Sequence, residues 1–255
     1  MDEVLLGPNS VLEGLRAGRR SVKRVYVLRQ RRGEKVERIL QIARARGIPI
    51  TWAEKDQLPS WCKSDKHQGI VALVEAQRYY GLEEALGESR QEAIPPLFLV
   101  LDRVQDPRNL GSILRTAESA AVDAVVIAKN RSAGLGRGSG KSSAGAQEYV
   151  RVVQVPNLVD SIRKIKGAGM WVVGADQGAE SLYWKTDLRG PLALVLGGEN
   201  EGLRRLTKES CDMLVRIPMM GKLSNLNVGV ATGIIVFEVL RQRLLSRENG
   251  RKEEK

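Results

Sequence analysis

The chain has 255 residues, 42% of them hydrophobic, which is enough for one large domain or two smaller ones. Its 41 lysines and arginines outnumber 30 aspartates and glutamates, and the net charge of +11 favours a polyanionic partner, nucleic acid ahead of a membrane. The longest apolar runs fall short of the roughly 20 residues of a membrane-spanning helix, and the acidic start differs from a signal peptide, so we expect a cytoplasmic protein. Two cysteines without CxxC spacing and a single histidine argue against disulfides and metal sites.

Residues 1–75 predict a small α/β domain. Apolar residues recur at helical spacing from Val11 to Arg20, after Asn9 and Ser10, which we expect to cap the helix. The further elements expected are a strand at 22–28, a basic helix at 34–46, a strand at 48–52, a polar helix-like segment, and a strand at 69–75.

This small domain also carries side chains that we expect to meet RNA. Arg16, Arg19 and Arg20 form a basic cluster that faces solvent or phosphate. His67 has two interpretations, an RNA contact or a structural hydrogen bond, because it lies far in sequence from the motifs described below.

A linker is expected at 76–96, where the composition turns polar. A short acidic helix at 82–86 interrupts it, and Pro95 and Pro96 end it. At the other end of the chain, residues 246–255 are too charged and too poor in apolar groups to pack, so we expect a disordered tail.

Residues 97–245 alternate strands and helices, which predicts a second α/β domain with a mostly parallel sheet covered by helices on both faces. Ligands of such folds bind at the carboxyl ends of the strands, and three strand ends here carry unusual polar residues. The strands are expected at 97–104, 124–128, 150–155, 170–176, 192–198 and 213–218, and the helices at 109–121, at 159–168 and after 225.

The first of these strand ends is DPRNLGSILR, residues 106–115. Asn109 is placed to cap the helix, Gly111 permits a close approach of backbone, and Arg115 follows about one and a half turns later. Arg115 is therefore a candidate for pointing at a ligand, although an ordinary helix start with a surface arginine explains the same residues.

The second strand end is LGGENEG, residues 196–202. Gly197 and Gly198 leave backbone amides and carbonyls bare, so a flat ligand such as adenine can lie against them. Glu199 comes next, near the first turn of a helix, where a carboxylate also complements the helix dipole.

The third strand end is IPMMGKLSNLNVGVA, residues 217–231, in which a rigid Ile217-Pro218 entry precedes glycines, amides and an apolar helix. Asn225 and Asn227 lie at the mouth of that helix. They are either ligand-binding amides, or a helix cap at 225 and a surface residue at 227.

A glycine-rich segment at 133–146, AGLGRGSGKSSAGA, has the composition of a phosphate loop without its spacing. Leu135 stands where GxxxxGK[ST] needs its first glycine, and the alternating glycines do not fit GxGxxG. We expect instead a mobile basic loop that closes over RNA with Arg131 and Lys141, or a loop without a ligand.

Taken in order, NLGSILR, LGGENEGL and IPMMGKLSNLNVGVATGI resemble the three motifs of the SpoU (TrmH-type) RNA ribose 2′-O-methyltransferases of the SPOUT superfamily. GPNSVLEGLRAGR and HQGIVALVEA resemble the ribosomal-protein-like (L30e-like) RNA-binding domain that precedes the catalytic domain in the 23S rRNA guanosine 2′-O-methyltransferases. The resemblance implies S-adenosylmethionine as methyl donor, no metal, a deep trefoil knot, and a homodimer that acts on 23S rRNA or a large-subunit precursor.

The resemblance also implies roles for single residues. Arg115 would be the main catalytic residue, helped by Asn109, Glu199, Asn225 and Asn227. Gly197, Ile217 and Leu226 would contact the cofactor mainly through their backbone, with Gly198 and Met219 nearby. Asn225 stands where the family commonly has serine, so hydroxyl chemistry is not available there and we expect a hydrogen bond instead.

The residue types suit this chemistry. A methyl sulfonium is already a strong electrophile, so the enzyme has chiefly to align the ribose hydroxyl and to stabilise charge developing on its oxygen. Arginine, with a pKa above ~12, is a poor proton acceptor, and we expect Arg115 to act electrostatically. The alternatives are a tRNA ribose methyltransferase and a non-catalytic RNA-binding or ribosome-assembly factor on the same fold; a dinucleotide-dependent oxidoreductase lacks its glycine fingerprint.

Overall fold

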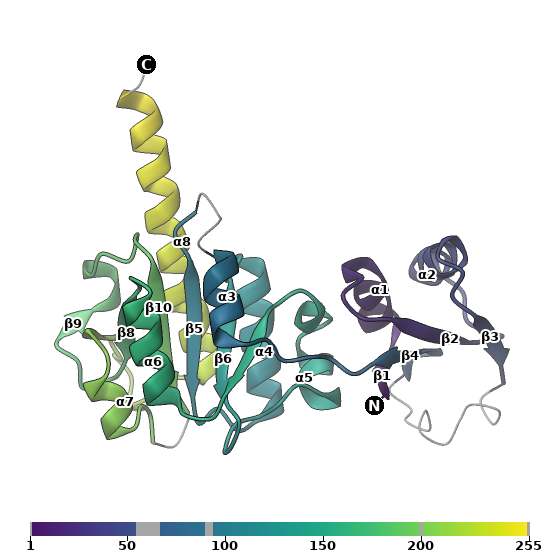
Figure 1. Ribbon diagram of the computed structural model, residues 1–255, viewed down its shortest axis with the longest axis horizontal. Coiled ribbons are helices and arrows are strands. Elements are labelled where there is room, and N and C mark those ends of the chain that lie inside the picture. The colour runs from purple at the N-terminus through teal and green to yellow at the C-terminus, as the bar shows by residue number, and fades with distance from the viewer. Residues whose placement is uncertain (1, 55–66, 90–93, 199–200, 254–255) are drawn as a thin grey trace.

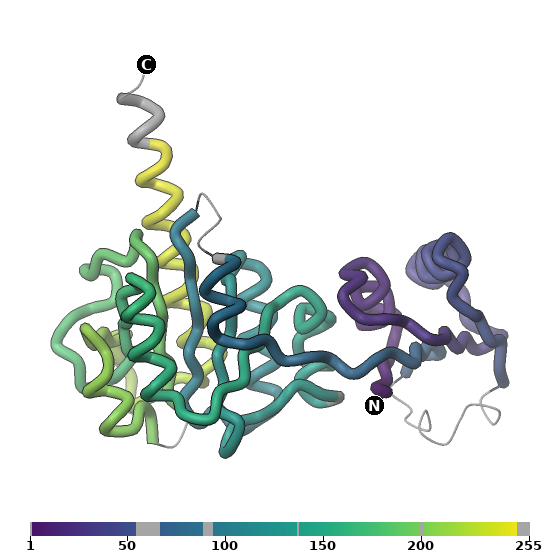
Figure 2. The backbone as a smooth tube through the Cα atoms, viewed as in Figure 1, coloured from purple at the N-terminus to yellow at the C-terminus, as the bar shows by residue number. Residues whose placement is uncertain are grey.

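The computed structural model describes residues 2–54, 67–89, 94–198 and 201–253, which form two α/β domains (Figure 1). The chain crosses from one domain to the other through a single extended segment ahead of α3, as the tube in Figure 2 shows. Most of the helix-like segment expected after the strand at 48–52 lies outside the described residues.

The N-terminal domain is a four-stranded sheet, in the order β1-β4-β2-β3, with two helices packed on one face. Leu15 and Ile39, one from each helix, are fully buried against the sheet because each helix carries a single apolar face. The elements are β1 (Asp2–Leu6), α1 (Pro8–Ala17), β2 (Val22–Leu28), α2 (Glu34–Ala45), β3 (Ile50–Ala53) and β4 (Ile70–Glu75).

Two details of this domain correct the sequence prediction. The acidic start forms β1, which pairs antiparallel with β4. The helix begins at Pro8 with Gly7 as its N-cap, at φ 88°, because proline fits a first turn that needs no N–H donor. Asn9 and Ser10 therefore lie inside α1 and do not cap it.

The predicted linker at 76–96 is too long, because α3 (Leu82–Ser89) belongs to the C-terminal domain. Leu82 and Leu86 project from one face of α3 into the core beneath the large sheet. Before the helix, the backbone of Tyr80 already bonds to the edge of that sheet. The polypeptide link between the two domains therefore runs only from residue 76 to about Tyr80.

The C-terminal domain is built on a seven-stranded sheet in the order β7-β6-β5-β10-β8-β11-β9, and all of its strand pairs are parallel. As predicted, helices cover both faces: α4 and α8 bury one core, α3 and α6 the other. The elements are β5 (Leu97–Asp102), α4 (Pro107–Ser119), β6 (Ala124–Ala128), α5 (Arg137–Ser142), the 3-10 helix η4 (Ala146–Glu148), β7 (Val152–Val155), α6 (Leu158–Gly167), β8 (Trp171–Ala175), β9 (Ser181–Leu182), the 3-10 helix η5 (Tyr183–Lys185), β10 (Leu192–Gly197), α7 (Arg205–Glu209), β11 (Met213–Arg216) and α8 (Val228–Glu253).

Helix α8 is longer than predicted. Ile235 and Val239 are fully buried against the sheet, and the helix then runs on to Glu253, so the tail expected to be disordered at 246–255 is helical up to that residue. A helix already nucleated in a core extends at little cost, and Arg, Glu and Lys are good helix formers. Within the described residues, no helix combines the length and the apolar character needed to cross a bilayer.

Candidate functional site

A cavity of about 340 Å³ opens at the carboxyl ends of β8, β10 and β11. The segments that follow these strands and the first turn of α8 form its walls, as expected for a parallel sheet. The residues expected from sequence that line it are Gly197, Gly198, Ile217, Asn225 and Leu226. The structure thus brings the second and third motifs together in one cavity.

The glycines of the second motif are required by backbone packing. A Cβ atom added at Gly197 would lie 2.1 Å from the backbone carbon of Gly202, and one added at Gly198 would lie 2.4 Å from the carbonyl oxygen of Arg103. The amide of Gly202 donates to the carbonyl of Gly198 at 3.0 Å, which closes the segment on itself. Backbone rather than side chains therefore forms this wall of the cavity.

A buried carboxylate that the sequence analysis missed fixes this segment. Asp102, the last residue of β5, is fully buried and accepts from the Nε of Arg204 at 2.7 Å and from its backbone N at 3.0 Å. The carbonyl of Asp102 also accepts from the amide of Gly198 at 2.8 Å. Both ends of the second motif are thus held on β5, and the only sequence signal was an aspartate closing an apolar strand.

A second missed contribution comes from the segment after β8. Asp176 and Gln177 line the cavity. The carboxylate of Asp176 pairs with the Nζ of Lys208 at 2.5 Å and accepts from the amide of Gly178 at 3.0 Å. The strand MWVVGAD ended in an aspartate, but nothing in the sequence placed it beside the other two motifs.

The first motif meets the third through a pair of amides. Asn227 donates from Nδ2 to Oδ1 of Asn109 at 3.0 Å, and its own Oδ1 accepts from the amide of Gly229 at 2.9 Å. Asn227 is therefore the N-cap of α8, and of the two interpretations of Asn225 the helix cap is wrong. The cap of α4 is Asp106, not Asn109, because its carboxylate accepts from a backbone amide in the first turn.

The surroundings of Asp106 favour the ionised form of its carboxylate. Hydrogen bonds from Arg108, through its guanidinium and then its backbone, hold the pKa of Asp106 below the usual value. An ionised carboxylate at the N-cap is stabilised by the positive end of α4. Because Asp106 caps this helix, the side-chain amide of Asn109 is free to accept from Asn227.

Two further predicted site residues, Arg115 and Met219, lie outside the lining of this cavity. Arg115 is exposed on α4 and is not among the residues that line the cavity of this chain, and Met219 is half-buried outside the lining. Glu199 lies outside the described residues.

The predicted RNA contacts divide into two groups. Arg16, Arg19, Arg131 and Lys141 are exposed. Arg20 is not available, because its guanidinium is buried in an ion pair with Glu148 at 2.6 Å. The structural interpretation of His67 fits the fold, since its Nδ1 accepts from the amide of Gly69 at 2.8 Å.

The glycine-rich segment at 133–146 is partly helical, which corrects the prediction of a mobile loop. Its helix α5 packs directly on α4: a Cβ at Gly111 would lie 1.9 Å from Oγ of Ser142 and 2.6 Å from the carbonyl oxygen of Ser139. Gly111 therefore serves a helix contact, not a ligand. Glycine here permits close helix packing, which composition alone does not distinguish from flexibility.

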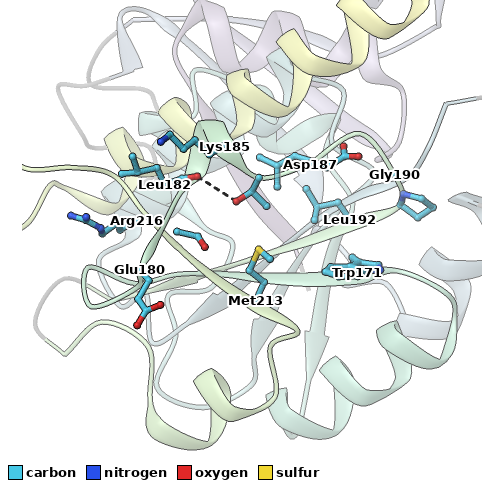
Figure 3. Close-up of a pocket in the computed structure, with 13 residues that line it drawn as sticks. Trp171, Glu180, Leu182, Lys185, Asp187, Gly190, Leu192, Met213 and Arg216 are labelled. Carbon is cyan, nitrogen blue, oxygen red and sulfur yellow. Dashed lines mark hydrogen bonds between the residues drawn. The ribbon is translucent and has the colours of Figure 1, made fainter.

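A second cavity, of about 560 Å³, lies at the β9 side of the sheet, and none of the motif residues that the structure describes lines it (Figure 3). Trp171, Leu192 and Met213 line it together with Lys185 and Asp187. The smaller cavity is the better candidate site, because it combines the motifs with the carboxyl ends of the strands.

Fold and site together define an α/β enzyme domain with a cofactor cavity at the carboxyl edge of a parallel sheet, preceded by an accessory domain. The model of the SpoU rRNA Methylase family matches residues 96–237, and the model described as RNA 2′-O ribose methyltransferase substrate binding matches residues 4–80. The chain belongs to the SpoU rRNA Methylase family.

Relatives share this organisation over nearly the whole chain. The chain is 41% identical to the 23S rRNA (guanosine-2′-O-)-methyltransferase RlmB of Ralstonia nicotianae, over 94% of this chain and 96% of the relative. It is 37% identical to the putative TrmH family tRNA/rRNA methyltransferase YacO of Bacillus subtilis, over 94% and 96%. An AdoMet-bound rRNA methyltransferase structure from Sinorhizobium meliloti matches with 27% identity and a TM-score of 0.77, over 94% of this chain and 87% of that chain.

Proposed function

We propose that the chain transfers a methyl group from S-adenosylmethionine to the 2′-hydroxyl of a guanosine ribose in 23S rRNA. The observation that carries the proposal is the cavity in which Gly197, Gly198, Ile217 and Leu226 of two family motifs converge. The 41% identity to an enzyme named for this reaction supports the substrate. A protein with this substrate acts in the cytoplasm.

The cavity suits a flat, hydrogen-bonding cofactor. Gly197 and Gly198 present bare backbone where any Cβ would collide. Ile217, directly after β11, and Leu226, just ahead of α8, add an apolar wall. Backbone at these four positions, with Met219 nearby, would hold the cofactor, which supplies an activated methyl group when bound. Asn225, with its exposed amide at the rim, is proposed as a hydrogen-bonding group for cofactor or ribose.

The remaining residues would act on the ribose. The hydrogen-bonded pair of Asn109 and Asn227 fixes one amide on α4 against another on α8, which suits alignment of a hydroxyl beside the cavity. Arg115 would stabilise the negative charge that develops on the 2′-oxygen. Glu199 is proposed as a further helper on the strength of the motif.

We further propose that two copies of the chain form the active unit. Val230, Phe237 and Leu244 recur every seven residues on α8 and are each about half exposed, at 52%, 48% and 50%. A stripe of this kind is typical of a helix that packs against another chain. A second copy would also account for Arg115, which does not line the cavity of its own chain, by bringing it to the partner's site.

The RNA would be held by charge. The net charge of +11 and the exposed Arg16, Arg19, Arg131 and Lys141 support a polyanionic substrate that contacts both domains. The name of the Bacillus subtilis relative keeps tRNA as the second candidate substrate.

The test is transfer of radiolabelled methyl from S-adenosylmethionine to unmodified 23S rRNA and, separately, to total tRNA. Ribose-methylated positions are then mapped by resistance to alkaline cleavage. Label at one 23S guanosine is the expected result. Label on tRNA alone would move the target, and cofactor binding without any transfer would favour a non-catalytic RNA-binding factor or a ribosomal particle as substrate.

A further inference from the structure

A buried ion pair joins the two domains. The guanidinium of Arg20, which follows α1, meets the carboxylate of Glu148 in η4 through two bonds, Nη2 to Oε1 at 2.6 Å and Nε to Oε2 at 2.9 Å. Only 6% of the Arg20 side chain and 2% of the Glu148 side chain are exposed. The third guanidinium nitrogen, Nη1, donates to the carboxylate of Glu3 at 2.7 Å, so all three nitrogens of the guanidinium are hydrogen-bonded. A forked pair of this kind fixes orientation as well as distance.

Two neighbouring contacts reinforce the same boundary. The hydroxyl of Tyr149 donates to the carboxylate of Glu13 at 2.6 Å, and the side chain of Gln77 donates to the carbonyl of Gln147. Gly145 packs closely against α1, because a Cβ added there would lie 2.7 Å from the Cβ of Glu13. We call the set formed by Arg20, Glu148, Glu13 and Tyr149 the domain latch.

The catalytic-domain half of the latch is in contact with the helix that carries the first motif. All three residues of η4 are buried, and η4 packs on both α1 and α4. Gln147 accepts from Oγ of Ser139 in α5, and α5 in turn packs against Gly111 of α4. The small domain is therefore connected through η4 and α5 to the helix that holds Asn109 and Arg115.

We propose that the domain latch positions RNA bound by the small domain relative to the active site, with Arg20 and Glu148 as positioning residues. This inference rests on the proposed function. A linker of a few residues alone would let the small domain reorient freely. The latch instead holds it in one arrangement, so RNA that docks on the small domain meets α4 in a defined position.

The proposal predicts a separation between binding and turnover. Glu148→Gln keeps the shape of the side chain and leaves Arg20 paired with Glu3, so the protein should fold. Because misplacing reactants by about 1 Å can cost about 100-fold in rate, we expect kcat for rRNA to fall about tenfold or more in Glu148→Gln. The KM for rRNA and the Kd for S-adenosylmethionine should stay within about threefold, since neither binding surface changes.

Two further variants make the test specific. Arg20→Lys keeps the charge but loses the fork, and its kcat should lie between those of wild type and Glu148→Gln. Arg189→Gln is the control: it breaks an exposed two-bond ion pair with Asp187 within the catalytic domain and should leave kcat unchanged. Unchanged kcat in Glu148→Gln with only a lower Tm would overturn the proposal, as would a parallel loss of cofactor affinity.

Small-angle X-ray scattering separates this inference from the proposed function. If the latch holds the domains, the radius of gyration of Glu148→Gln exceeds that of wild type and of Arg189→Gln, whether or not RNA is a substrate. An unchanged scattering curve would contradict the latch. Failure of wild-type protein to methylate any RNA would instead contradict the proposed function and leave the scattering result standing.

Discussion

Two segments of the C-terminal domain are both rich in glycine but have different roles. In the segment at 133–146, glycine allows helix α5 to pack tightly: a Cβ at Gly138 would lie 2.8 Å from the side chain of Pro107 in α4. In the segment at 196–202, glycine allows a strand end to fold back on itself and present bare backbone to a cavity. The first segment builds packing and the second builds a binding wall.

The difference teaches that position, rather than glycine content, identifies the binding segment. Gly197 ends β10 and Gly198 follows it, at the edge of the sheet where the ends of β8 and β11 also lie. The longer segment follows β6, which β5 separates from β10 in the sheet, and its helix packs on α4 instead of lining the cavity. Single substitutions can separate these two roles, and can separate cofactor binding from methyl transfer.

The largest effect is expected for Arg115→Lys, which should slow methyl transfer without weakening the binding of RNA or cofactor. Lysine keeps the positive charge but loses the planar fork, so turnover should fall about 100-fold or more, while RNA and cofactor affinities remain near wild type. Single-turnover methyl transfer and filter binding measure the two quantities. Arg163→Lys, on the exposed side of α6, is the control; if Arg115→Lys keeps activity within a few-fold, the role proposed for Arg115 is wrong.

Gly197→Ala should break the binding wall. The added Cβ would lie 2.1 Å from backbone of Gly202, and backbone cannot move aside as a side-chain tip can. We expect cofactor affinity to fall about 100-fold, which corresponds to about 2.7 kcal/mol. Isothermal titration with S-adenosylmethionine measures it. Gly221→Ala, where an added Cβ meets nothing within 4 Å, should bind normally.

Gly111→Ala should break the packing role and spare binding. The Cβ would collide with the backbone of Ser139, and overpacking of this kind costs about 1–3 kcal/mol of unfolding free energy. Urea denaturation measures the loss. The affinity for S-adenosylmethionine should stay near wild type, and Gly136→Ala, with open space around it, should change stability by less than about 0.5 kcal/mol. Loss of cofactor affinity in Gly111→Ala would mean that both segments serve the cavity.

Much of the fold was predictable from sequence, because strand and helix periodicity is a local property. The alternation after Leu97 predicted a mostly parallel sheet with two covered faces, and this is confirmed. The errors fall where a long-range contact decides the outcome. β1 forms only because β4 offers it an edge, and α3 joins the large core although its residues look like a linker.

The motifs indicated which segments form the site. The side chains that hold these segments through contacts between residues far apart in sequence were missed. The family resemblance predicted that Gly197 and Leu226 contact the same ligand, and both line one cavity. No pattern showed that Asp102 would anchor the second motif through Arg204. Arg20 was predicted to contact RNA because a basic cluster usually faces solvent, and its partner Glu148 lies 128 residues away. The deep trefoil knot stays a prediction of the family resemblance.

Asn109→Ala tests the amide pair without disturbing either helix. Asp106 still caps α4 and Oδ1 of Asn227 still caps α8, so stability should change by less than about 0.5 kcal/mol. Methyl transfer should fall about tenfold through lost alignment. Asn227→Ala is the comparison, because it removes the cap as well and should cost about 1 kcal/mol more in stability. Equal stabilities for the two variants would contradict the assignment of Asn227 as cap.

The smallest effect is expected at the boundary of the packing segment, in Tyr149→Phe. Burial and the carboxylate of Glu13 raise the pKa of Tyr149 from 10.0 to about 12, so the folded protein keeps a proton that the unfolded chain has lost. This stabilisation is fully present below pH 10 and is lost as the pH rises through about 12. Tyr149→Phe should cost about 1 kcal/mol at pH 7 through the lost hydrogen bond and should show a shallower decline in stability between pH 10 and 12. Urea denaturation at pH 7, 10 and 11 measures both, with Tyr183→Phe as the control. If wild type and Tyr149→Phe decline in parallel, Tyr149 does not hold its proton through the contact with Glu13. Beside Glu13, the domain boundary would then depend on the packing of Gly145 on α1.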